Sequence, residues 1–461
     1  MRLFPFLKPG AETTNRKIFR AALIVGTLTL IARAGTILKE MIVAFAFGRG
    51  DALDAFLIAF LLPAFVVTLV SGTVASALIP VFIEVDQKQG RDAAERLLSS
   101  VCLISAATLA ASAILLGVLA PWYLPYLAHG FSPEKLRLTA ALLYILLPWI
   151  VLSGIAQIVT YILNAGERFA LPALVPLTTP LLVIIFVMAA GQSRTAFTLA
   201  VGSSIGSVIE MGLLLAMLKA HGTRLRWRWF GFNKDLRIVL KQTGPLLAGG
   251  LLMASAPMIG QSLAAMLPSG SVSALAYANR LVGGITGLGT VALSTATLPY
   301  FSRMAAENDW ASCWHTLKRY SALLLATAVP FTLAFIALSR PLVSALYQRG
   351  AFTAADADLV AHLQSLLAIQ IPFLMMCALL VRFVSAIRRN DLLMYGSALN
   401  LMANVVLNFM LMKIWGLMGI ALSTSLMQIL SFFFFATCTL WLLGRNRSAL
   451  LNNVPVHEVR N

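Results

Sequence analysis

Apolar runs long enough to cross a lipid bilayer recur along nearly the whole chain of 461 residues. A hydrocarbon core of about 30 Å requires roughly 20 apolar residues per helix. Charged residues make up only 11% of the sequence, whereas soluble domains carry about 25%. We therefore predict an all-α polytopic membrane protein with twelve transmembrane helices near residues 18–47, 53–83, 97–120, 139–163, 173–190, 196–219, 243–267, 276–302, 320–338, 359–387, 393–412 and 416–443.

The distribution of basic residues predicts the orientation, because Lys and Arg are retained on the cytoplasmic side of short loops. With a cytoplasmic N-terminus, most of the 35 Lys and Arg residues fall in cytoplasmic segments. We expect a multi-pass protein of a bacterial inner membrane with both termini in the cytoplasm. The net charge of +17 is then mostly a topology signal and does not indicate nucleic-acid binding.

The densest basic stretch, Arg224-Leu-Arg-Trp-Arg-Trp-Phe, interleaves cationic and aromatic residues. Such a pattern can bind nucleic acid, but it is also what the lipid headgroup zone selects. We favour membrane lipids as its partner and expect no nucleic-acid partner.

An internal repeat divides the chain. A shift of 219 residues aligns Asp54-Ala-Phe-Leu-Ile-Ala with Ser273-Ala-Leu-Ala-Tyr-Ala, and Ile79-Pro-Val-Phe with Leu298-Pro-Tyr-Phe. Repeats with an even number of helices share one topology and are related by an axis along the membrane normal. We predict two pseudo-symmetric six-helix lobes around a central cavity: an N-lobe at 1–218, a basic cytoplasmic connector at 219–242, and a C-lobe at 243–461 with a short cytoplasmic tail.

Ionisable residues inside predicted spans are the clearest functional signal, since each costs roughly 2.5–3.5 kcal/mol at a helix centre. On the first span, Arg33 and Glu40 share a helical face with Thr36, and Lys39 borders it. In one interpretation, Arg33 and Lys39 receive an anionic headgroup in the cavity. In the other, they form internal ion pairs with Glu40 or Asp54 that join helices.

Arg280 has no acidic residue near it in sequence and shares a helix face with Tyr277, Gly284 and Gly287. By the repeat, it approaches the cavity from the side opposite Arg33. An excess of positive charge between the lobes suits a pyrophosphate. By contrast, Glu210 and Arg382 lie near predicted span ends, where snorkelling or a local pair accounts for them.

No catalytic or cofactor motif stands out. The His and Cys residues do not fall at metal-ligand spacing, and the sequence has neither a nucleotide-binding loop nor a nucleophile with its base. We expect no enzyme activity, no metal and no cofactor. We also expect no ATP-driven pump within this chain, which leaves the membrane potential or a cation as the energy source for any transport.

Several motifs resemble one known family. Five motifs carry the resemblance: Lys39-Glu-Met-Ile-Val-Ala-Phe-Ala-Phe-Gly, Asp54-Ala-Phe-Leu-Ile-Ala-Phe-Leu-Leu-Pro, Tyr277-Ala-Asn-Arg-Leu, Arg349-Gly-Ala-Phe-Thr-Ala and Asn404-Val-Val-Leu-Asn. With these motifs the chain is similar to the MurJ (MviN-type) lipid II flippases of the MOP exporter superfamily. The resemblance spans nearly the whole chain. It implies a MATE-like fold and a flippase that moves an undecaprenyl-pyrophosphate-linked glycan to the periplasmic leaflet by alternating access.

Carried onto this sequence, the resemblance assigns Arg33, Lys39 and Arg280 to the pyrophosphate, and Glu40 and Asp54 to the family's acidic positions. It also implies a role beside cell-envelope glycan biosynthesis enzymes, as in peptidoglycan synthesis. Two departures are the segment Leu62-Pro-Ala-Phe-Val-Val-Thr, where the family has Leu-Pro-Asn followed by an arginine pair, and the absence of the last two of the family's fourteen helices. An exopolysaccharide or O-antigen-type flippase stays open as an alternative. So does a MATE-like ion-coupled drug exporter, in which coupling would depend on Glu40 and Asp54 as acidic residues of the cavity.

Overall fold

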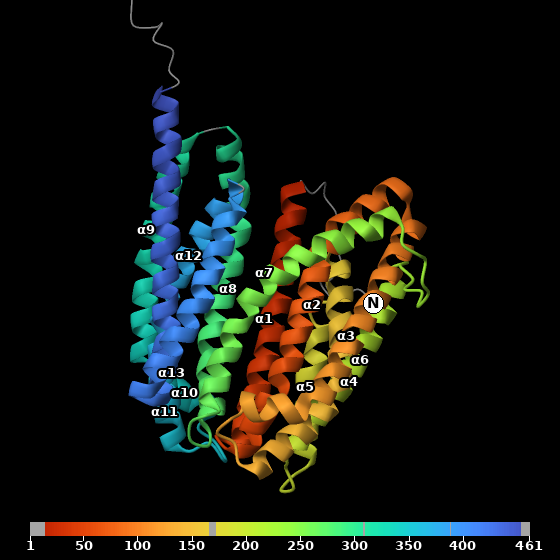
Figure 1. Ribbon diagram of the computed structural model, residues 1–461, viewed down its shortest axis with the longest axis vertical. Coiled ribbons are helices and arrows are strands. Elements are labelled where there is room, and N and C mark those ends of the chain that lie inside the picture. The colour runs from red at the N-terminus through yellow and green to blue at the C-terminus, as the bar shows by residue number, and fades with distance from the viewer. Residues whose placement is uncertain (1–13, 166–171, 308, 388, 453–461) are drawn as a thin grey trace, which may run out of the picture. The chain divides into compact units, whose positions relative to one another are not determined.

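The computed structural model describes residues 14–165, 172–307, 309–387 and 389–452, and these residues form helices joined by short loops (Figure 1). A backbone in lipid must satisfy its own hydrogen bonds, which favours helices for apolar runs of this length. The N-terminal half contains α1 (Thr14–Phe47), α2 (Asp51–Gln89), α3 (Arg91–Leu127), α4 (Pro133–Ala165), η1 (Val175–Leu177), α5 (Thr178–Ala189) and α6 (Ala196–Ala220).

The C-terminal half begins after the basic stretch. It contains α7 (Lys234–Ala264), α8 (Ser271–Ala306), α9 (Trp310–Ala337), α10 (Ser339–Tyr347), α11 (Ala354–Ala368), α12 (Gln370–Ala386) and α13 (Asn390–Asn452). Helix α13 bends at Gly416, whose φ of 56° and ψ of −129° are not helical. This conformation is accessible essentially to glycine alone, and it separates two expected spans.

The predicted fold class is confirmed, because each of the twelve expected segments lies on these helices. Within the described residues, eight helices are long and apolar enough to cross a membrane by themselves, and Val175–Ala189 forms a shorter apolar helix. The span expected at 359–387 is divided at Ile369 into α11 and α12. The short helix α10 was not predicted. Arg168 and Arg388 are two of the basic residues that the orientation argument assigns to the cytoplasm. They lie outside the described residues, as do both chain ends.

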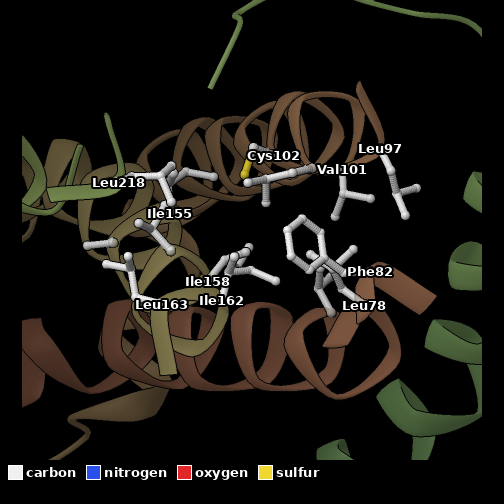
Figure 2. Close-up of a cluster of buried hydrophobic side chains, with 14 of the residues drawn as sticks. Leu78, Phe82, Leu97, Val101, Cys102, Ile155, Ile158, Ile162, Leu163 and Leu218 are labelled. Atoms are coloured by element: carbon white, nitrogen blue, oxygen red, sulfur yellow. The ribbon is translucent and has the colours of Figure 1, made fainter. Parts of the chain in front are cut away.

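The chain packs as two compact units. The first contains residues 1–43, 66–117 and 144–244. Its core lies between α2, α3, α4 and α6, where aliphatic side chains pack with Phe82 and the buried Cys102 (Figure 2). Labelled members of this core are Leu78, Phe82, Leu97, Val101, Ile155, Ile158, Ile162, Leu163 and Leu218.

The second unit contains residues 44–65, 118–143 and 245–461. Its core includes Phe301 of α8 and Phe383 of α12, whose rings meet edge to face with centroids 5.6 Å apart. This unit takes in the end of α1, the start of α2, and the α3–α4 turn in addition to the C-terminal helices. The division into an N-lobe, a connector and a C-lobe stays a prediction.

Candidate functional site

Asp54, in the first turn of α2, binds the N-terminus of α8. Its Oδ2 accepts a hydrogen bond from the main-chain N–H of Gly270 at 2.7 Å, and its Oδ1 accepts one from Ser273 N at 2.8 Å. The first N–H groups of a helix have no partner within that helix and attract negative charge. Asp54 is only 1% exposed, so it acts as a buried N-cap contributed by another helix.

Lys135, near the start of α4, neutralises this buried carboxylate. Its Nζ lies 3.0 Å from Asp54 Oδ2 and 2.6 Å from Asp51 Oδ1. The ammonium also lies 3.9 Å from the centre of the Phe131 ring. Lys135 is 8% exposed, and a buried lysine is stable only when its charge is paired and hydrogen-bonded. We call Asp51, Asp54, Lys135, Gly270 and Ser273 the cap cluster.

A second set of contacts in the same unit joins the end of α1 to the α10–α11 turn. The Ala351 N–H donates to Phe45 O at 2.9 Å, and the Arg49 guanidinium pairs with Asp356 at 2.8 Å. Between them, Gly48 has a φ of 56°, and a Cβ there would collide with the Ala351 carbonyl. The close approach of these two turns therefore requires glycine at position 48.

Aromatic side chains pack directly beside these contacts. The buried Tyr277 hydroxyl donates to Gly48 O at 3.2 Å. Its ring centroid lies 4.9 Å from that of Tyr347 and 5.4 Å from that of Phe352. Buried aromatic rings exclude water and strengthen nearby electrostatic contacts. We call the contacts between the end of α1 and the α10–α11 turn the α1 contacts. The cap cluster and the α1 contacts together form a buried junction within the second unit, which we call the closed junction.

Arg280 lies less than one turn beyond Tyr277 on α8, and its side chain is exposed. Gly283 and Gly287 follow it at i+3 and i+7, so the three residues share one helix face. Both glycines line a cavity of about 390 Å³. The cavity lies between α8, α12 and α13 and is lined by Gly283, Thr286, Gly287, Thr290, Leu374, Cys377, Ala378, Val381, Arg382 and Gln428.

Sequence reasoning missed one residue of this cavity. Arg382 was assigned to snorkelling near a span end, whereas the structure places it in the cavity lining with Thr290 and Gln428. The Thr290 hydroxyl donates to Thr286 O at 2.6 Å, which leaves its oxygen as an acceptor. A guanidinium, an amide and hydroxyl oxygens can together bind phosphate and sugar hydroxyl groups.

The other predicted cationic residues lie on α1 in the first unit. Lys39 Nζ pairs with Glu40 Oε1 at 2.6 Å, and because both residues lie on α1 this pair does not join two helices. Glu40 is buried and Arg33 is exposed. The structure therefore brings Lys39 and Glu40 together, and joins Asp54 to α8 rather than to either of them. Binding of a substrate by Arg33, Lys39 and Arg280 stays a prediction.

These features define a class by its fold: a multi-pass α-helical membrane protein, similar in fold to solved structures of a lipid flippase and of a multidrug resistance transporter. A solved structure described as "Lipid II flippase MurJ, inward closed conformation" is similar with a TM-score of 0.78 and 22% identity, over 90% of this chain and 87% of that one. A multidrug resistance MATE family transporter of the MOP superfamily, in an inward-facing conformation, gives a TM-score of 0.70 at 12% identity, over 93% and 99% of the two chains.

The family follows from the sequence. The profile described as Lipid II flippase MurJ matches residues 43–448, and the chain belongs to this family. The probable lipid II flippase MurJ of Synechocystis is 28% identical over 96% of this chain and 84% of its own length. The Lipid II flippase MurJ of Burkholderia cenocepacia is 28% identical over 75% and 69%. The Vibrio cholerae relative is 26% identical over 91% and 82%.

Proposed function

We propose that this protein is a flippase that carries a polyprenyl-pyrophosphate-linked glycan, lipid II or a close relative, from the cytoplasmic to the periplasmic leaflet. Family membership across residues 43–448 is the observation that carries this proposal. The exposed Arg280 beside the Arg382 cavity supports it, because a pyrophosphate leaving water needs several cationic donors. The protein moves its substrate without chemical change and is a transporter rather than an enzyme.

We place the protein in the bacterial inner membrane with both termini in the cytoplasm, as the basic residues predict. The cap cluster and the α1 contacts then lie on the periplasmic side. They close that side when formed, and they must separate for the glycan to leave. Alternating access requires such a bistable element, whose two states differ by a few kcal/mol.

Two carboxylates are candidates for coupling transport to the membrane potential or a cation. Glu40 pairs with Lys39, and Asp54 holds the first turn of α8. A cation or proton that competes for either carboxylate would weaken the contact that it makes. We favour Asp54 for this role, because its contacts join α2, α4 and α8.

The test is complementation of a strain depleted of its resident lipid II flippase. The wild-type gene is expected to restore growth, and Arg280→Ala is expected to abolish rescue. Arg303→Ala is the matched control, because Arg303 is an exposed arginine in the last turn of the same helix. Expression of all three proteins is checked in membranes. Equal rescue by wild type and Arg280→Ala would contradict the role of Arg280.

The alternative substrate is the lipid-linked oligosaccharide of an exopolysaccharide or O-antigen pathway. It is favoured by the segment Leu62-Pro-Ala-Phe-Val-Val-Thr, which lacks the family's arginine pair. Failure of the wild-type gene to rescue, together with loss of exopolysaccharide on its deletion, would assign the protein to that substrate. A drug exporter fits less well, because cationic drugs are repelled by Arg280 and Arg382 in a low dielectric. For such an exporter, Arg280→Ala would leave drug efflux unchanged or improve it.

A further inference from the structure

The basic stretch between α6 and α7 is fixed against α3 through its main chain. The Arg224 N–H donates to Glu95 Oε1 at 2.7 Å, and the Arg226 N–H donates to Ser99 Oγ at 3.0 Å. Glu95 and Ser99 are both buried. A buried carboxylate that accepts a main-chain N–H forms a strong, charge-assisted hydrogen bond. The main chain of the stretch therefore has a defined path along α3.

The side chains that this path presents are large, aromatic and exposed. Trp227 is 53% exposed, Trp229 39% and Phe232 62%. The Trp229 and Phe232 rings meet edge to face with centroids 5.0 Å apart. Three exposed aromatic residues next to exposed arginines are unusual on a protein surface that faces water. They are common on a surface that lies in the headgroup zone of a bilayer.

A cationic groove begins where the aromatic residues end. It has a volume of about 380 Å³ and is lined by Phe232, Lys234, Arg237, Ile238 and Lys241. The three cations follow i, i+3 and i+7 on α7, so they share one helix face. No acidic side chain belongs to the lining. Neighbouring Asp235 instead accepts a hydrogen bond from Gln89 of α2 at 3.2 Å.

We infer that this groove binds the phosphate headgroup of an anionic glycerophospholipid, with Trp227 and Phe232 inserted in the interface beside it. Three cations around one small groove match a phosphodiester, and the aromatic rings match the ester and upper acyl region. Nucleic acid fits less well, because the groove also includes Ile238 and opens beside exposed apolar rings. The inference rests on the orientation proposed above, which places the stretch at the cytoplasmic leaflet.

The test measures lipid binding directly and needs no transport. Full-length protein in detergent is titrated with phosphatidylglycerol and, separately, with phosphatidylcholine, and bound lipid is counted by native mass spectrometry. The wild type is expected to prefer phosphatidylglycerol. The groove variant Lys234→Gln/Arg237→Gln/Lys241→Gln is expected to bind it at least about tenfold more weakly, with phosphatidylcholine binding unchanged.

The matched control is Arg303→Gln/Lys318→Gln/Arg319→Gln, which removes the same charge from exposed residues on the same predicted membrane side. It is expected to keep the preference for phosphatidylglycerol. A second variant, Trp227→Ala, tests the aromatic part and is expected to weaken binding without changing charge. The inference would be overturned if phosphatidylglycerol binding were weakened equally in the groove variant and the control variant. It would also be overturned if the wild type showed no preference between the two lipids, or if the groove preferred an oligonucleotide to phosphatidylglycerol.

Discussion

Replacing Asp54 with alanine tests the cap cluster most directly. The change removes the acceptor for two main-chain N–H groups and for the Lys135 ammonium. Loss of a helix N-cap costs about 0.5–2 kcal/mol, and breaking a buried ion pair costs about 3–5 kcal/mol. Because Lys135 keeps Asp51 as a partner, the lower end applies. We expect the closed junction to lose about 3 kcal/mol relative to an open one.

That free energy has a measurable consequence in hydrogen exchange. At 1.4 kcal/mol per factor of ten, the main-chain N–H groups of Gly270 and Ser273 are expected to exchange roughly 100-fold faster in Asp54→Ala. If the whole junction opens, the Ala351 N–H, bonded to Phe45 O, is also expected to exchange faster. Acceleration confined to Gly270 and Ser273 would mean that only a helix end has frayed.

Asp51→Ala is the matched control for this experiment. It also removes a carboxylate bound to Lys135, but the Asp51 side chain is 63% exposed. Exposed ion pairs contribute about 0–1 kcal/mol, so exchange is expected to rise less than about fivefold. Equal and small effects of Asp51→Ala and Asp54→Ala would refute the argument that the buried carboxylate holds the junction closed.

Three further predictions concern the cavity, α1 and the bend in α13. Arg382→Ala is expected to lower transport about 10- to 100-fold in a vesicle flipping assay with unchanged thermal stability, because one charge-assisted contact is lost; Arg303→Ala serves as its control. Lys39→Met is expected to abolish complementation and Lys39→Arg to preserve it, because only the second keeps the cation beside Glu40; equal rescue by both would contradict this. Gly416→Ala is expected to destabilise the protein by about 1–3 kcal/mol in thermal melts, since its φ is 56°. The control Gly212→Ala, in the interior of α6 where a Cβ meets no atom within 4 Å, is expected not to destabilise it.

The spans could be predicted from sequence because each depends on its own residues. Apolar length and the glycine at the bend are local signals, and the structure follows them. The lysine of the cap cluster could not be found in this way. Lys135 lies 81 residues from Asp54, and in sequence it was simply one basic residue of a short loop. Arg33 and Lys39 were the cations considered from sequence as partners of Asp54, and Lys135 was not.

The cavity illustrates the same limit. From sequence, Arg280 was placed on one face of α8 with two glycines, but the neighbour of that face could not be identified as α12. Arg382 was therefore judged by its distance from a predicted span end, where snorkelling or a local pair accounts for an arginine. Its position in the lining depends on which face of α12 packs against Gly283 and Gly287, and that is decided by packing over the whole unit.

The cap cluster also explains why the repeat is asymmetric at one position. Asp54 and Ser273 are the residues aligned by the shift of 219, and they are hydrogen-bonded to each other. The repeat predicts a two-fold axis between the halves of the chain, and residues related by such an axis can touch only near it. Two acids there would repel each other in a low dielectric, so one copy must supply the carboxylate and the other the N–H groups. Ser273→Asp is therefore expected to speed exchange at Gly270 at least tenfold, and adding Asp54→Ser is expected to restore part of the protection. A Ser273→Asp protein with normal exchange would show that the contact does not lie where the two copies meet.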